Sequence, residues 1–266
     1  MPDSCVLFAR RQRLKALWRP LLLLALMLAL VWWFVDTASE QYRWQGYRVW
    51  RYVGVWDEEG FHPGVLLEAL GVTFRLTVVS LAFSLAWGGL LASMRLSASP
   101  VARLLSSLML GLLRNTPLLM QLFMVYFVAA PVLGVGPFTA AVLSLGLFEG
   151  AYIAEIFRAG IMGVPRGQWE AALSLGMPVG MAARLVVMPQ ALRQSLPALA
   201  GQMVSLIKDT SLVSAIAVAD LTMRTRVVIT DTFLSFEPWL LAAAVYLVLT
   251  SLVSVPARLL ERKEHS

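Results

Sequence analysis

The sequence predicts an all-α integral membrane protein, and two observations support this prediction. Hydrophobic residues make up 59% of the 266 residues and charged residues only 14%, whereas soluble domains contain roughly 25% charged residues. Several apolar runs also exceed the ~18 residues that mark a spanning helix. Because hydrocarbon offers no water, the backbone groups of each run must pair within that run, which makes the runs helices.

We expect about six transmembrane helices. The predicted spans are residues 20–35, 65–94, 104–130, 138–157, 196–219 and 238–255. The first run, with its basic start, also has features of a cleaved signal peptide. However, the run ends in Trp32, Trp33 and Phe34, and Asp36 stands where cleavage requires a small residue. These residues favour a retained membrane anchor.

The distribution of Lys and Arg orients the predicted helices. If both termini are cytoplasmic, 14 of the 22 basic residues lie in inner segments and 5 in outer segments. This excess follows the positive-inside rule, so we predict a multi-pass protein with both termini inside. The net charge of +6 does not indicate nucleic-acid binding, because long apolar runs separate the basic residues. Cys5 is the only cysteine, which excludes an intrachain disulfide.

Residues 36–64 form the largest predicted segment outside the membrane on the outer side. Aromatic residues alternate with charges there, namely Tyr42, Trp44, Tyr47, Trp50, Tyr52 and Trp56. We expect an amphipathic segment that lies on the outer leaflet. A docking surface for a soluble partner is the alternative.

The loop between the fourth and fifth predicted spans, at about residues 160–195, carries a spaced motif. Glu170-Ala171-Ala172 is followed after three residues by Gly176, and after nine more by Val186-Val187-Met188-Pro189. This pattern resembles the EAA signature of bacterial ABC-importer permeases, where it forms a short cytoplasmic helix that docks into a separate ATPase subunit. The resemblance implies a chain that moves a solute and does not itself hydrolyse ATP.

Three further strings resemble one branch of that family, the permeases for polar amino acids of the histidine, glutamine, glutamate, arginine and opine type. They are Leu113-Arg114-Asn115-Thr116-Pro117-Leu118-Leu119-x-Gln121-Leu122-Phe123, Gly150-Ala151-Tyr152-Ile153-Ala154-Glu155 and Ile207-Lys208-Asp209-Thr210-Ser211-Leu212. The family core has five spans. The resemblance therefore implies a permease core at residues 64–266, and residues 1–63 add a basic tail, an extra helix and the outer segment.

The resemblance also implies partners and a location. Two permease copies, identical or similar, would form the path in a bacterial inner membrane. An ABC ATPase dimer would bind ATP and magnesium, and a periplasmic binding protein would deliver the amino acid. We expect no cofactor in this chain, since it has no phosphate-binding loop and no metal-ligand spacing. Alternatives are a stand-alone secondary transporter and a membrane-embedded enzyme or scaffold, although no catalytic motif is present.

The motif residues suit a docking role. Ala171 and Ala172 favour a helix and allow close approach of a partner, and Glu170 can accept hydrogen bonds across an interface. Gly176 permits a sharp turn, and Pro189 punctuates the return into the fifth span. A plain surface helix with a solvated Glu170 is the alternative.

Ionisable residues within predicted spans are costly and indicate function. A zwitterionic amino acid needs a cation for its carboxylate and an anion for its amine, and neutral groups can add hydrogen bonds. We expect the substrate path to be lined by Lys208, Asp209, Arg114, Glu155, Asn115, Thr210 and Ser211. The alternatives are a structural polar network and, for Glu155, a surface pair with Arg158.

Two other acidic residues fall within predicted spans. Glu149 stands where the resembled family is expected to have a neutral polar residue. We expect it either to tune the path toward a cationic or amide substrate or to pair with Arg75. Glu68 and Arg75 are seven residues apart, hence on one helix face, and are expected to pair with each other.

Overall fold

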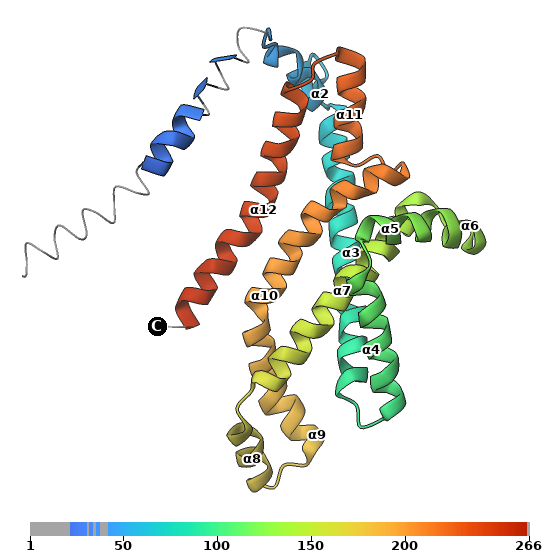
Figure 1. Ribbon diagram of the computed structural model, residues 1–266, viewed down its shortest axis with the longest axis vertical. Coiled ribbons are helices and arrows are strands. Elements are labelled where there is room, and N and C mark those ends of the chain that lie inside the picture. The colour runs from blue at the N-terminus through green and yellow to red at the C-terminus, as the bar shows by residue number, and fades with distance from the viewer. Residues whose placement is uncertain (1–21, 31, 34–35, 38–41, 265–266) are drawn as a thin grey trace, which may run out of the picture. The chain divides into compact units, whose positions relative to one another are not determined.

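Figure 1 shows the computed structural model, which describes residues 22–30, 32–33, 36–37 and 42–264. The chain divides into two compact units, Met1–Gly46 and Tyr47–Ser266. In the first unit, the described parts of 22–37 are helical and exposed. The rest of the first predicted span lies outside the described residues.

The second unit is built almost wholly from helices. Its elements in chain order, beginning at the junction with the first unit, are η1 (Gly46–Arg48), α2 (Trp50–Val53), β1 (Gly54–Asp57), β2 (Gly60–Pro63), α3 (Val65–Leu96), α4 (Pro100–Asn115), α5 (Leu118–Phe123), η2 (Met124–Ala129), α6 (Ala130–Leu133), α7 (Pro137–Gly163), α8 (Arg166–Ser174), α9 (Val179–Ala182), η3 (Ala183–Val187), α10 (Met188–Asp209), η4 (Thr210–Ile216), α11 (Leu221–Thr232) and α12 (Glu237–Glu264). The predicted all-α membrane fold is confirmed.

Three helices of the described chain are long and apolar enough to cross a membrane: α3, α7 and the Glu237–Ala257 part of α12. They correspond to the second, fourth and sixth predicted spans, and α7 continues beyond the predicted end at 157 to Gly163. A fourth crossing results if Pro100–Asn115 and Leu118–Leu133 are taken together, although these two segments are bent by 105°.

The third predicted span, 104–130, is therefore not one continuous helix but a helix pair with a break inside it. The chain breaks at Thr116, which is extended with φ −112° and ψ 140°, directly before Pro117. A proline ring disfavours the helical conformation of the preceding residue, and it has no N–H to continue the helix. Hydropathy does not register this break because the residues on both sides are apolar.

The bounds of the fifth predicted span, 196–219, are wrong. Helix α10 begins at Met188 and ends at Asp209, after which the chain tightens into the 3₁₀ turns of η4. Ala217 then adopts a left-handed conformation with φ 60°, which ends the helical path before α11. Lys208 and Asp209 consequently lie in the last turn of α10 and not in the middle of a span.

Both π-helical segments precede prolines. The segment η2 comes just before Pro131, and η3 comes just before Pro189. A proline ring clashes with the carbonyl group four residues earlier. Widening the turn to i→i+5 hydrogen bonding relieves that clash without ending the helix.

The outer segment is not a simple amphipathic stretch. It contains the short elements η1 and α2 and then an antiparallel hairpin. In this hairpin Val55 pairs with His62 and Trp56 pairs with Phe61. The expected pair of Glu68 and Arg75 also does not form, since both side chains are exposed and no ion pair joins them in the described chain.

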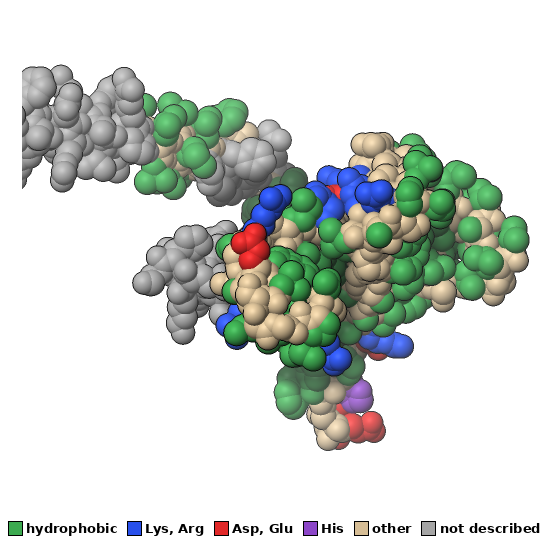
Figure 2. Space-filling view, turned by 90° about the horizontal axis from the view of Figure 1, so that it is seen from below, with side chains coloured by type: hydrophobic (Ala, Val, Ile, Leu, Met, Phe, Trp, Pro, Cys, Tyr) green, Lys and Arg blue, Asp and Glu red, His purple; other side chains and the backbone are tan. Residues whose placement is uncertain are grey.

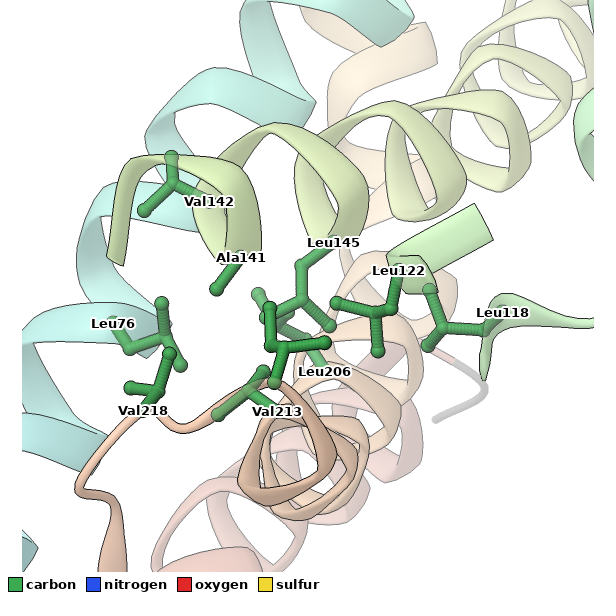
Figure 3. Packing of buried hydrophobic residues seen from close by; sticks show 10 residues of the cluster. Leu76, Leu118, Leu122, Ala141, Val142, Leu145, Leu206, Val213 and Val218 are labelled. Atoms are coloured by element: carbon green, nitrogen blue, oxygen red, sulfur yellow. The ribbon is translucent and has the colours of Figure 1, made fainter. Parts of the chain in front are cut away.

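The largest core cluster lies where α7 meets α3, α5, α10 and η4. Figure 3 shows its buried side chains pointing toward one another from these elements. Leu76 of α3, Leu145 of α7 and Leu122 of α5 are among the fully buried members. The core thus centres on the N-terminal half of α7.

Close packing of α3 against α7 depends on glycines. Gly146 and Gly150 of α7 face Phe83, Ser84 and Trp87 of α3, and Gly88 of α3 lies against Gly150. A Cβ atom at Gly150 would lie only 2.8 Å from Trp87 Cδ1 and 3.0 Å from the Ser84 carbonyl oxygen. Small residues spaced by four allow this approach, as is common between membrane helices.

We predict that Gly150→Ala destabilises the protein by about 1–3 kcal/mol, because the added methyl group overpacks the α3–α7 contact. Gly71→Ala is the matched control, since Gly71 lies within α3 and has open space around it. That substitution is expected to be neutral or stabilising by up to ~1 kcal/mol. Thermal unfolding of both purified variants in detergent is the measurement, and equal melting temperatures would contradict the packing argument.

Candidate functional site

A cavity of about 510 Å³ lies between α7 and α10. Its lining comes from the C-terminal half of α7 and from the middle of α10, and it comprises Tyr152, Glu155, Ile156, Arg158, Ala159, Gly160, Gln194, Ser195, Ala198 and Gln202. At one end the helices approach closely, because a Cβ at Gly160 would collide with the Ser195 hydroxyl. The polar residues of the wall come from both helices, so relative movement of the helices changes the cavity.

Glu155 is the centre of a charge cluster on the cavity wall. Its Oε2 accepts a hydrogen bond from Arg158 Nε at 2.9 Å, and Arg158 Nη2 lies at the same distance from it. Its Oε1 lies 3.6 Å from Arg95 Nη1 and 3.9 Å from Arg114 Nη1. One carboxylate thus links α3, α4 and α7 and faces three guanidinium groups. The pair with Arg158, which the sequence offered as the alternative to a path role for Glu155, is present, whereas Arg95 was not predicted from the sequence.

Two side chains of the sequence string around Arg114 make specific contacts in the structure. The Arg114 guanidinium lies 5.3 Å from the centre of the Tyr152 ring, a cation–π distance. Gln121 Nε2 donates to the Leu113 carbonyl at 2.7 Å and to Thr116 Oγ1 at 2.7 Å. The break at Thr116 leaves the last carbonyl groups of α4 without a helical hydrogen bond, and the Gln121 side chain donates to one of them. Asn115 is exposed at the end of α4.

A second polar group lies deeper in α7. Glu149 is fully buried, and Gln202 of α10 donates a hydrogen bond to its Oε2. Its Oε1 is buried and has no hydrogen-bond partner in the described chain. The carboxyl group of Asp209 approaches Glu149 from α10. Glu149 thus contacts α10 and not Arg75, so the predicted pairing with Arg75 is wrong.

Sequence reasoning missed Gln202. The available signal was its spacing, because Gln202 and Asp209 are seven residues apart and share one face of α10. Of the other predicted path residues, Lys208 is exposed, Ser211 is half-buried and Thr210 is buried. Thr210 Oγ1 donates to the Ile207 carbonyl at 2.6 Å. The structure brings Asp209 to Glu149 and brings Arg114 to Glu155, while Lys208 and Asn115 join neither group.

The motif loop consists of α8, α9 and η3. Glu170 and Ala171 are exposed on α8, whereas Ala172 is buried. Gly176 has φ +80° between α8 and α9, a conformation that favours glycine. Pro189 lies in the first turn of α10. The loop is held to the helices because Gln190 of α10 donates to Gln168 of α8 at 3.2 Å.

The free face of this loop is apolar. Trp169 packs inward with Val164, Val187 and Ala191. Large apolar side chains point outward over the rest of the loop, namely Leu173, Leu175, Val179, Met181 and Leu185. Several exposed large apolar side chains on one short loop are typical of an interaction site.

Among the residues that the structure describes, no group of three or more His, Cys, Asp or Glu side chains could hold a metal ion. A helical membrane fold with a cavity between two of its helices, and with a loop of exposed apolar side chains joining the same two helices, is typical of a subunit of a membrane transport system.

A sequence model of the family described as "Binding-protein-dependent transport system inner membrane component" matches residues 84–265. This chain belongs to that family. The match covers α7, α10 and the motif loop, so it includes the whole candidate site.

Curated relatives agree with this assignment. The chain is 34% identical over 207 residues to the putative glutamine transport system permease protein GlnP of Rickettsia felis, covering 76% of this chain and 95% of the relative. It is 36% identical over 203 residues to the glutamine transport system permease protein GlnP of Escherichia coli K12, covering 75% and 92%. It is 39% identical over 186 residues to the probable amino-acid ABC transporter permease protein PatM of Vibrio harveyi, covering 68% and 83%.

Solved structures show the same fold. A crystal structure described as an amino acid ABC transporter with histidines matches with a TM-score of 0.69 and 37% identity, covering 75% of this chain and 94% of that one. A structure of the MetNI methionine ABC transporter in inward-facing conformations matches with a TM-score of 0.63 at 19% identity, covering 74% and 95%. At that lower identity the likeness shows the fold alone.

We predict that Glu155→Gln lowers stability by about 1–2 kcal/mol, because charge-assisted hydrogen bonds are lost and the groups are partly exposed. The substitution leaves Arg95, Arg114 and Arg158 without a shared counter-charge. Glu68→Gln is the control, since this exposed carboxylate in the first turn of α3 has no ion pair in the described chain. Thermal unfolding measures both, and an unchanged midpoint for Glu155→Gln would show that the cluster does not hold the helices together.

Proposed function

We propose that this chain is the permease subunit of a binding-protein-dependent ABC importer that carries polar amino acids across a bacterial inner membrane. The observation that carries this proposal is the likeness to the amino acid ABC transporter structure, which extends over 75% of the chain at 37% identity. The three relatives above carry glutamine or amino-acid transport names, which points to the same substrate class.

The proposed assembly contains two permease subunits, identical or similar, and two ATPase subunits. ATP and magnesium bind to the ATPases, and a periplasmic binding protein delivers the amino acid. Residues 64–266 form the permease core, and residues 1–63 are an addition to it. Both termini lie in the cytoplasm, so the motif loop faces the ATPase. The outward apolar side chains of this loop support that role.

The proposed coupling between ATP binding and the opening of the cavity follows from how the chain connects the motif loop to α7 and α10. The loop is continuous with α7 at one end and with α10 at the other, and these helices enclose the cavity. When the ATPases bind ATP and close, α8 moves with them and shifts α7 relative to α10. The cavity then opens to the other side of the membrane. ATP drives this change because it binds one conformation of the assembly more tightly than the other.

The substrate path runs along the polar faces of α7 and α10. Asp209 and Glu149 supply two neighbouring carboxyl groups, and Gln202 offers a carboxamide beside them. Arg114 and Glu155 shape the wall on the other side of Tyr152. Lys208, Thr210, Ser211 and Asn115 line the part of the path that the second permease subunit completes. The polar groups of Glu149, Asp209 and Gln202, which come together inside the bundle, support a polar ligand at this depth.

Glu170→Lys is expected to abolish both ATPase co-purification and ATP-driven amino-acid uptake, while the permease still inserts into the membrane. An unmatched charge in an interface costs on the order of 2–5 kcal/mol. Asp231→Lys makes the same charge change on an exposed residue of α11 and is expected to leave both readouts unchanged. Normal uptake and co-purification with Glu170→Lys would exclude the proposed dock.

Asp209→Asn keeps the size of the side chain and removes its charge. If Asp209 faces the path, uptake falls at least ~10-fold while the melting temperature and basal ATP hydrolysis of the complex persist, as expected for loss of a charged contact. Lys208→Met tests the neighbouring cation in the same way. Full uptake with unchanged substrate preference in both variants would remove these residues from the path, and a loss of thermal stability would assign them a structural role.

A further inference from the structure

The hairpin of β1 and β2 lies outside the part of the chain that the family model matches, and the proposed transport function assigns it no role. It is a defined structure. Asp57 pairs in register with Gly60, and Asp57 Oδ1 accepts hydrogen bonds from the backbone N–H of Glu59 at 2.9 Å and of Gly60 at 3.2 Å. Gly60 has φ +125°, a conformation open to glycine.

The two faces of the hairpin differ in chemistry. Trp56 and Phe61 are directly paired across the strands, with ring centroids 5.3 Å apart. Phe61 lies over Gly54, where a Cβ would collide with its ring. On the other face His62 Nε2 lies 3.1 Å from Asp57 Oδ1. Alternation of side chains along each strand therefore places Trp56 and Phe61 on one face and Val55, Asp57 and His62 on the other.

The aromatic face is uncovered within the described chain. Trp56 is 78% exposed, which is high for a large aromatic side chain in an ordered strand. Phe61 is 44% exposed despite its contact with Gly54. In Figure 2 the hairpin, marked by the purple histidine and the red acidic turn, projects sideways from the helical body when the molecule is viewed along its long axis.

The hairpin is held rigidly where α3 begins. Val49 is buried in a cluster that contains Leu66 of α3, Leu221 of α11 and Ala242 of α12. The backbone N–H of Gly64 donates to the Val53 carbonyl at 2.8 Å, which closes the base of the hairpin. The base therefore packs on helices α3, α11 and α12 near their N-terminal ends.

Physical constraints place the hairpin at the membrane interface. Only one residue separates β2 from α3, a helix long and apolar enough to cross a membrane, whose Phe74 and Val78 are exposed on one face. The outer edges of a two-stranded hairpin carry unpaired backbone N–H and C=O groups, so it cannot enter the hydrocarbon core. Full exposure to water is also unfavourable for the apolar rings of Trp56 and Phe61. The interfacial region accommodates both, and tryptophan is enriched there.

We propose that the hairpin of residues 54–63 is a lipid anchor that lies in the interface of the leaflet where α3 begins. Trp56 and Phe61 insert among the lipids at the boundary of headgroups and acyl chains, and the face with Asp57 and His62 remains toward water. The sideways projection and the direct continuation into a lipid-facing helix favour lipid over a soluble protein as the occupant.

The test uses the full chain in phosphatidylcholine nanodiscs with Cys5→Ser as the background. A single cysteine at Phe61 is labelled with an environment-sensitive fluorophore, and nitroxide-bearing lipids serve as quenchers. The matched controls are cysteines at Glu58 in the turn and at His62 on the opposite face. The label at 61 is expected to be quenched at least about threefold more strongly than either control, because only the aromatic face meets lipid at interfacial depth.

Equal quenching at positions 58, 61 and 62 would overturn the proposal. So would a label at 61 that is unquenched in nanodiscs and becomes shielded only when the purified periplasmic binding protein is added, because the surface would then belong to that protein. Circular dichroism and the melting temperature of each labelled variant confirm that the fold is retained. Quenching requires no transport, so its outcome is independent of whether the chain imports amino acids.

Discussion

The close approach of α3 and α7 is the contact on which the rest of the structure depends. Gly146 and Gly150 remove side chains from α7 where Phe83 and Trp87 of α3 must lie, and Gly88 brings the two backbones together. Lipid gives helices little hydrophobic reason to associate, so close van der Waals packing has to supply the attraction. Once α7 is fixed against α3, its remaining faces direct Glu149 toward α10 and Glu155 toward α4.

Polar groups inside the bundle need a hydrogen-bond or ion-pair partner, because burying them without one costs free energy. Glu155 satisfies this requirement with arginines from three helices, and Gln121 satisfies it for the backbone at the break between α4 and α5. Glu149 departs from it at Oε1. This carboxyl group lies beside Asp209 and Gln202, between the two helices that also enclose the cavity. Two groups of α3, Ser80 Oγ and Trp87 Nε1, are also buried without a hydrogen-bond partner in the described chain, and Trp87 packs against α7.

The motif loop and the cavity are connected to the same two helices, α7 and α10. The motif loop leaves α7 through the buried Val164 and returns into α10 beside Pro189. Trp169, Val187 and Ala191 pack this loop as a small core of its own. The loop can therefore move as a rigid piece, and any displacement reaches α7 and α10 directly. The hairpin directly precedes the N-terminal end of α3, so the proposed lipid anchor would hold that end of the bundle at the interface.

The sequence by itself determined the membrane class, the helices α3, α7 and α12, and the motif loop with its glycine turn at Gly176, and it offered the ion pair of Glu155 with Arg158 as one of two alternatives. Each of these depends on local composition or on spacings of a few residues, which the chain encodes directly. Only the tertiary structure decided the rest. The third span broke before Pro117 and α10 ended at Asp209, because hydropathy records how apolar a segment is and not where its backbone turns. Arg95 joined Glu155, and Gln202 rather than Arg75 met Glu149, because partners on different helices are chosen by how those helices pack.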